Sequence, residues 1–243
     1  MFFEVNNKLI LINDDCLNAM SDISDKSIDL ILCDLPYGIT NAEWDTIIPF
    51  GLLWEQYNRI IKDNGAIILF SMQPFTTKVI QSNLKDFRYC WYWVKNYCTG
   101  FSYARYQPMR KLEDICVFYK KHPTYNPQGL IKIENPKIKK GKESNLYRST
   151  LNNTYTPKYK NYPNNLLYFN GVTNKERLHP TQKPIELLEY IIKTYTNEND
   201  IVLDNCMGSG STGEACHNLK RHFIGIEKDK EFFNIALKRL NYK

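Results

Sequence analysis

The chain has 243 residues, of which 43% are hydrophobic, enough for one α/β domain with an inserted lobe but not for a second full domain. No apolar run reaches 18 residues and no basic segment leads into an apolar one at the start, so we expect neither a membrane span nor a signal peptide. The seven cysteines form no Cys-X-X-Cys pair and mostly lie in apolar runs, which favours buried thiols in the cytoplasm and no metal site.

The net charge of +6 is concentrated in one segment. Residues 120–160 contain ten Lys and Arg residues and two Glu residues, whereas the rest of the chain is slightly acidic. Tyr and Asn residues are interleaved with these cations, a mixture typical of surfaces that contact phosphates and bases. A simple solvated surface is the alternative interpretation.

In the first half of the chain, predicted strands alternate with predicted helices. Residues 8–13 and 28–33 are short apolar runs, typical of strands buried on both faces, and each is followed by Asp. Residues 66–70 form a third such run. Helical patterns follow at 16–23, 50–61 and 74–83. Strand, crossover helix and strand together form the unit of a parallel sheet.

The middle of the chain predicts less regular structure. We expect aromatic-rich strands at 89–95 and 115–119, as an antiparallel edge, with a loop at 97–111 between them. From His122 to about Leu178 the periodicity disappears, which indicates an inserted lobe or a mobile loop.

Regular structure returns at Pro184, where apolar spacing predicts a helix that has Pro in its first turn. The remaining predicted elements are a strand at 200–204, a glycine-rich turn at 205–213, a helix at 214–219, a strand at 222–227 and a helix at 231–240. If the strands near Leu9, Ile28 and Ile67 follow the strand at 222–227, the sheet is a circularly permuted Rossmann-type sheet. The strand ends at Asp34 and Gly208 would then open on the same edge.

The segment Asp34-Leu35-Pro36-Tyr37 ends the second predicted strand, where open α/β sheets bind ligands. Pro36 biases Leu35 toward extended geometry, so that the Leu35 carbonyl and the Asp34 carboxylate become paired acceptors beside the Tyr37 ring. Two acceptors and a flat ring suit the amine of a nucleobase. An ordinary turn after a strand is the alternative, because Asp and Pro are common turn residues.

The glycine-rich turn supports two hypotheses. Gly208, Gly210 and Gly213 match the dinucleotide fingerprint, and Glu227 follows the first of them by 19 residues, which favours a nicotinamide-dependent dehydrogenase. Against this, only 16 residues follow Glu227, and Asp204 would lie near a pyrophosphate. An adenosyl ligand with a charged amino-acid tail and no phosphate fits that acid better.

Together these motifs resemble the amino-group DNA methyltransferases of the β arrangement, in which the catalytic motif precedes the target-recognition region and the cofactor motif. The resemblance rests on Asp34–Tyr37 for Asp-Pro-Pro-Tyr, on the run His179-Pro180-Thr181-Gln182-Lys183-Pro184, and on the loop from Asp204 to Gly213. It covers most of the chain, and compact phage and prophage members look most similar. Leu35 and Cys206 stand where the family usually has Pro and Phe.

The resemblance implies an α/β, Rossmann-like, circularly permuted S-adenosylmethionine-dependent methyltransferase fold with a mostly parallel sheet. Residues 1–95 would form the catalytic half, 96–178 the inserted target-recognition region with an edge strand near 114–120, and 179–243 the cofactor-binding half. The implied reaction transfers a methyl group from S-adenosylmethionine to the exocyclic amine of a flipped-out adenine in double-stranded DNA. The same reaction on cytosine stays an alternative, as do the dehydrogenase and a non-catalytic DNA-binding module.

The resemblance also implies partners and roles for individual residues. Besides DNA, the candidate partners are a second copy of the chain and a cognate restriction endonuclease, in the cytoplasm of a bacterial or phage-infected cell and at its nucleoid. Glu227 would bind the ribose, Asp15 the adenine amine, and Asp204 with residues 181–183 the methionine end. Lys183 would position the backbone or pair with a carboxylate, and His179 would be a structural turn residue.

The candidate site residues fall into three groups. The catalytic candidates are Asp34, Leu35, Pro36 and Tyr37. The cofactor-binding candidates are Asp15, Cys16, Thr181, Gln182, Lys183, Asp204, Cys206, Gly208, Ser209, Gly210, Thr212 and Glu227. The DNA-binding candidates are Arg105, Arg110, Lys111, Lys139, Lys140 and Arg148.

Overall fold

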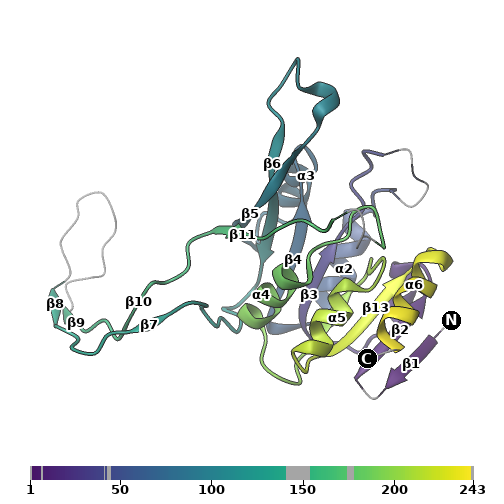
Figure 1. Ribbon diagram of the computed structural model, residues 1–243. Coiled ribbons are helices and arrows are strands. Elements are labelled where there is room, and N and C mark those ends of the chain that lie inside the picture. Colours follow the sequence, from purple (N-terminus) through teal and green to yellow (C-terminus); the bar gives the residue numbers. More distant parts are fainter. Residues whose placement is uncertain are drawn as a thin grey trace. The chain divides into compact units, whose positions relative to one another are not determined.

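The computed structural model describes residues 2–6, 8–40, 42, 45–140, 154–173 and 178–241. The chain divides into a larger unit, residues 1–126 with 165–243, and a smaller unit, residues 127–164. The larger unit contains a nine-stranded sheet in the order β1-β2-β13-β12-β3-β4-β6-β5-β11 (Figure 1). Its strands are β1 (Phe2–Asn6), β2 (Leu9–Asn13), β3 (Ile28–Asp34), β4 (Ile61–Ser71), β5 (Phe87–Thr99), β6 (Arg110–Phe118), β11 (Leu166–Tyr168), β12 (Ile201–Asp204) and β13 (His222–Glu227).

The five central strands are parallel, and β13 lies between β2 and β12. The last strand of the chain therefore pairs with β2, near the start of the chain, which confirms the predicted circular permutation of a Rossmann-like sheet. Strands β6 and β5 continue the sheet on the side of β4, with β6 antiparallel to both neighbours, as predicted for that side. The carboxyl ends of the five parallel strands all meet at one edge.

Helices cover both faces of this sheet because its central strands are apolar on both sides. Helices α4, α5 and α6 pack with one core cluster, and α1, α2 and α3 pack with the other. The helices are α1 (Cys16–Ser21), α2 (Phe50–Ile60), α3 (Phe75–Ser82), α4 (Ile185–Tyr195), α5 (Ser211–Asn218) and α6 (Lys230–Asn241), with a short 3-10 turn η1 (Phe101–Tyr103). Among the described helices, none is long and apolar enough to cross a membrane.

One polar residue interrupts the apolar run of β3, and it does so at the amino end. The Asp29 carboxylate accepts a hydrogen bond from the Ile201 backbone N–H at 2.9 Å and pairs with Lys62 at 2.7 Å. Because both carboxylate oxygens have partners, Asp29 joins β3 to β12 at an end of the sheet away from the predicted site.

The structure corrects the predicted boundaries in the middle of the chain. The loop predicted at 97–111 is wrong at both ends, because β5 continues to Thr99 and β6 begins at Arg110, so that only residues 100–109 lie outside the strands of this hairpin. Backbone pairing across this hairpin outweighs the loop-like composition. Strand β11 was also missed, since three residues are too few to show a period; it pairs in parallel with β5.

The smaller unit is built from two short antiparallel pairs. Strand β7 (Ile131–Lys132) pairs with β10 (Tyr159–Lys160), and β8 (Lys139–Lys140) pairs with β9 (Thr154–Tyr155). The Asn161 side chain donates a hydrogen bond to the Gly129 carbonyl at 2.8 Å and so joins the two ends of this unit. The three-part division proposed from the resemblance concerns the roles of the segments and stays a prediction.

The close packing of α5 generates a prediction. A Cβ at Gly213 would lie 2.8 Å from the side chains of both Leu240 and Phe223, whereas a Cβ at Gly51 in α2 meets nothing within 4 Å. We expect Gly213→Ala to lower the free energy of unfolding by about 1–3 kcal/mol through overpacking. The matched control Gly51→Ala should raise it by about 0.5–1 kcal/mol, because Ala favours a helix more than Gly does. Urea unfolding measures both, and equal effects would contradict this packing.

Candidate active site

A cavity of about 880 Å³ lies at the carboxyl ends of the parallel strands. Asp34–Tyr37, which follow β3, line it together with the glycine turn that follows β12 and with Glu227 at the end of β13. The two strand-end sites that were predicted from the sequence, at Asp34 and Gly208, therefore share one cavity.

Hydrogen bonds fix the conformation of residues 34–40, the segment that ends β3 and follows it. The Tyr37 hydroxyl donates a hydrogen bond to Asp34 Oδ1 at 2.8 Å, and the Tyr37 ring stacks on Phe75 with centroids 4.9 Å apart. The buried Asp45 carboxylate then accepts hydrogen bonds from three successive backbone N–H groups, at residues 38–40, over 2.7–2.9 Å. These bonds hold the turn and lower the pKa of Asp45 in spite of its burial.

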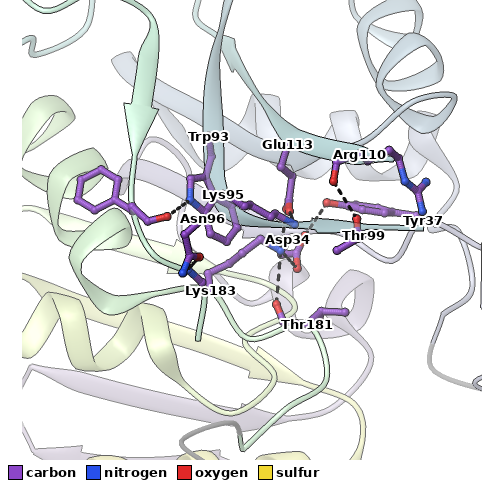
Figure 2. A network of polar contacts seen from close by, with 12 residues as sticks. Asp34, Tyr37, Trp93, Lys95, Asn96, Thr99, Arg110, Glu113, Thr181 and Lys183 are labelled. Atoms are coloured by element: carbon purple, nitrogen blue, oxygen red, sulfur yellow. Dashed lines mark hydrogen bonds and ion pairs between the residues drawn. The ribbon is translucent and has the colours of Figure 1, made fainter. Parts of the chain in front are cut away.

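The Asp34 carboxylate also lies in a chain of buried ion pairs (Figure 2). Asp34 Oδ2 contacts the Lys183 ammonium, which lies 3.0 Å from Glu113, and Glu113 pairs with Lys95 at 2.6 Å. Burial raises the pKa of Asp34, with Lys183 opposing it. Burial alone would lower the pKa of Lys183, but the carboxylates of Asp34 and Glu113 outweigh it and raise that pKa, so Lys183 stays a cation.

The glycine turn is shaped by its hydrogen bonds and by α6. Gly208, at φ 51°, donates its N–H to Glu227 Oε2 at 2.9 Å, while the other Glu227 oxygen accepts from Asp229 N–H at 2.8 Å. Gly210, at φ 78°, lies outside the cavity lining, and a Cβ there would be 3.0 Å from Ala236 Cβ. Gly210 is therefore required by the turn and by packing against α6, and its predicted role beside the cofactor stays a prediction.

Asp204, at the end of β12, is a buried carboxylate. It accepts hydrogen bonds from the Thr212 hydroxyl at 2.6 Å and from Cys206 N–H at 3.1 Å. Burial raises its pKa to about 6, and in the described part of the chain no Lys or Arg forms an ion pair with it or with Glu227. Asp204 and Glu227 both line the cavity, where their carboxylates can accept hydrogen bonds from a cationic or hydroxyl-bearing ligand.

The turn before α4 lies against the glycine turn. Gln182 Oε1 accepts from Leu178 N–H at 2.9 Å and from the Ser209 hydroxyl at 3.4 Å, and Thr181 N–H donates to His179 Nδ1 at 3.2 Å. The His179 ring packs on Phe232 with centroids 4.1 Å apart, and burial lowers its pKa to about 4. His179 is thus a neutral turn residue at physiological pH.

The remaining candidates are scattered. Asp15 and Cys16 line the cavity, where Asp15 caps α1 by accepting from Leu17 N–H at 3.0 Å. Among the DNA-binding candidates, Arg110 lines the cavity and Arg105 and Lys111 are exposed on the hairpin. Lys139 is exposed in the smaller unit, whereas Arg148 and the side chain of Lys140 lie outside the described residues.

Sequence reasoning missed Glu113, Lys95 and Asp45. In the sequence Lys95 is a single charge at the end of an aromatic strand, Glu113 lies outside the predicted strands, and Asp45 lies in a loop, so all three look like solvent-facing residues. The signal that was available is that Glu113 lies just before an apolar strand, next to an acidic neighbour, Asp114. That signal is weak without knowledge of which strands pair.

Comparison with known proteins gives a consistent family match. The family model described as "DNA methylase" (N6_N4_Mtase) matches residues 28–238. The type II methyltransferase M.HpaI of Haemophilus parainfluenzae is 32% identical over 95% of this chain and 74% of its own length. The type II methyltransferase M1.MboII of Moraxella bovis is 29% identical over 95% of both chains.

Solved structures share the fold. The crystal structure of the M1.HpyAVI–SAM complex is 28% identical, with a TM-score of 0.67 and coverage of 96% of this chain and 99% of that one. The PvuII DNA methyltransferase, titled cytosine-N4-specific, has a TM-score of 0.70 at 16% identity, covering 98% of this chain and 87% of that one, and shows likeness of fold alone.

Proposed function

Because the chain belongs to the DNA methylase family, whose members transfer a methyl group from S-adenosylmethionine to amino groups of DNA bases, we propose that its target is the amine of adenine. The observation that carries this proposal is the shared cavity, which Asp34 and the glycine turn both line. A carboxylate in the first position of the catalytic segment favours adenine. The dehydrogenase hypothesis has no support in the family match.

The cavity residues fit a methyl donor with an adenosyl group and a charged amino-acid tail. Glu227 is suited to the ribose hydroxyls, Asp15 to the adenine amine, and Asp204 with the 181–183 turn to the methionine end. Gly208 has a positive φ of 51°, and a Cβ there would lie 3.4 Å from the His179 ring, so glycine suits this position of the turn. Thr212 acts through Asp204, to which its hydroxyl is bonded. When bound, S-adenosylmethionine supplies an electrophilic methyl group.

The acceptor end of the cavity suits an exocyclic amine. The lone pair of such an amine is delocalised into the base, which makes it a poor nucleophile. Hydrogen bonds from its two hydrogens to the Asp34 carboxylate and the Leu35 carbonyl would make the nitrogen pyramidal and aim its lone pair at the methyl group. The base must leave the duplex to reach these acceptors, and Tyr37, backed by Phe75, is suited to stack on it. Leu35 keeps the backbone carbonyl that the reaction requires.

The choice of base generates the first prediction. We expect tritium from labelled S-adenosylmethionine to appear in 6-methyladenine when the protein acts on unmethylated duplex DNA that is then digested to nucleosides. Asp34→Ala should lower the rate by at least about 100-fold, because it removes the charged acceptor of the amine. The matched control Asp22→Ala, at an exposed carboxylate, should keep the wild-type rate. Label in 4-methylcytosine alone would overturn the base assignment, and mapping the labelled positions identifies the target sequence.

Burial of Asp204 generates a second prediction. Its pKa of about 6 lies above the usual value near 3.9, so the buried acid is partly protonated at mildly acidic pH. If Asp204 holds the ammonium of S-adenosylmethionine, affinity should rise up to about tenfold per pH unit below 6 and level off above 7. His179 titrates below this range. Calorimetric titration at a series of pH values measures the affinity for S-adenosylmethionine. Asp204→Asn should make this affinity independent of pH in the range. A wild-type affinity that does not change with pH would contradict the role of Asp204 in binding the ammonium.

The hairpin of β5 and β6 is the part of the larger unit that we propose to contact DNA. Because Ser71 at the carboxyl end of β4 pairs with Asp114, the hairpin beyond that pair projects past the edge where the cavity lies (Figure 1). Phe101 and Tyr106 at its tip are 81% and 85% exposed. Exposed aromatic rings among Arg105, Arg110 and Lys111 suit a surface that meets phosphates and bases. Lys139, Lys140 and Arg148 belong to the other unit, and we propose a DNA-contacting role for them as well.

This surface predicts a salt dependence. DNA affinity should fall steeply with salt, because phosphate contacts release counterions, and Arg105→Ala or Lys111→Ala should each reduce the slope of log K against log salt by about 0.9. The matched control is Arg88→Ala, an exposed arginine at the opposite end of β5, which should leave the slope unchanged. Fluorescence anisotropy with a labelled duplex measures the slopes. Equal slopes in all three variants would contradict a DNA role for the hairpin.

The wider assignments are also part of the proposal. We propose that the protein works in the cytoplasm of a bacterial or phage-infected cell, on nucleoid DNA. Relatives named as type II methyltransferases support a cognate restriction endonuclease and a homodimer as candidate partners.

A further inference from the structure

Both oxygens of the Asp34 carboxylate already have partners. Oδ1 accepts the Tyr37 hydroxyl at 2.8 Å, and Oδ2 contacts the Lys183 ammonium. A target amine needs one of these oxygens as its acceptor. Tyr37 is held beside Asp34 by the same turn, whereas Lys183 comes from a distant segment and already contacts a second carboxylate, so Lys183 is the partner that the amine can displace.

Lys183 has a second carboxylate within reach. Its ammonium lies 3.0 Å from Glu113, 3.4 Å from the Thr181 carbonyl and 4.9 Å from the centre of the Phe70 ring. The side chains of Lys183 and Glu113 are only 9% and 7% exposed. An ammonium at this depth is costly without a carboxylate partner, so a lysine that leaves Asp34 requires Glu113.

Glu113 is itself supported from the hairpin. Lys95 on β5 pairs with it at 2.6 Å and lies 4.7 Å from the centre of the Trp93 ring. The chain Lys95, Glu113, Lys183 and Asp34 contains two cations and two anions in alternation (Figure 2). Transfer of Lys183 from Asp34 to Glu113 therefore keeps both ammonium groups beside a carboxylate, and the incoming amine then donates a hydrogen bond to the Asp34 carboxylate in place of the lysine.

We propose that Glu113 is a positioning residue that takes over Lys183 when the target amine replaces the lysine at Asp34 Oδ2. This inference rests on the proposed function, because it concerns the base that enters the same cavity. Because of Glu113, the Asp34 carboxylate is paired with Lys183 in the free protein and is available to the amine as an acceptor in the complex. The residue lies on the hairpin that we propose to contact DNA, 79 positions after Asp34 in the chain.

Two variants remove the Glu113 carboxylate, one with the Lys95 cation still present and one without it. Glu113→Gln keeps the shape of the side chain but leaves Lys183 with Asp34 as its only carboxylate partner. The double variant Lys95→Met with Glu113→Gln removes the hairpin pair together, so that the remaining Asp34–Lys183 pair is neutral and the fold is protected from an unpaired cation. In both variants Lys183 stays on Asp34 and competes with the amine.

The experiment compares rates and base recognition. On unmethylated duplex DNA we expect both variants to lower the single-turnover methylation rate by about 10- to 100-fold, while the affinity for S-adenosylmethionine stays within about threefold. The second readout is binding of duplexes that carry either adenine or unsubstituted purine, which lacks the amine, at the mapped target. Wild type should prefer adenine by about tenfold, and both variants should lose this preference.

A merely structural role for Glu113 predicts a different pattern. It would lower stability and rate together and leave the preference for adenine over purine intact, which would overturn the proposal, as would a wild-type rate in the double variant. If the labelled base is cytosine, pyrimidin-2-one replaces purine as the probe without the amine. Failure of the wild-type protein to methylate DNA would refute the proposed function, whereas a normal wild type with a normal double variant refutes the role of Glu113 alone.

Discussion

Five parallel strands end at one edge of the sheet, and this alignment brings together the polar residues on which the site depends. Asp34 ends β3, Asp204 ends β12 and Glu227 ends β13, so three carboxylates from distant parts of the chain line one cavity. The central strands are apolar on both faces, where helices cover them, and the strand ends are where polar side chains are tolerated. The cavity is thus a direct consequence of the strand order.

Burial determines how these carboxylates behave. Asp204 has hydroxyl and backbone donors, and burial raises its pKa, whereas Asp34 is paired with a lysine that is shared with Glu113. Carboxylates at one edge therefore have different environments, and in the proposed function Asp204 serves the cationic methyl donor whereas Asp34 serves the neutral amine. The family to which the chain belongs carries out a reaction that requires a site for a methyl donor and a site for an amine.

The sequence predicted the main elements well, because buried parallel strands are apolar runs and their helices have a clear period. It was less successful where pairing decides the structure. The hairpin of β5 and β6 was predicted as a loop in part, and β11 was not predicted. Glu113 and Lys95 were missed for the same reason, since a charge in a strand is buried or exposed according to the neighbours of that strand.

The sequence by itself determined the order of the elements, the glycine turn and the acids at the strand ends, because these depend on local periodicity and on the residues that turns require. Only the tertiary structure decided which groups share the cavity. It packed Gly210 against α6, and it joined Lys183 to Asp34 and Glu113. Such contacts link residues far apart in the chain, and their energies depend on burial, which no local pattern of residues records.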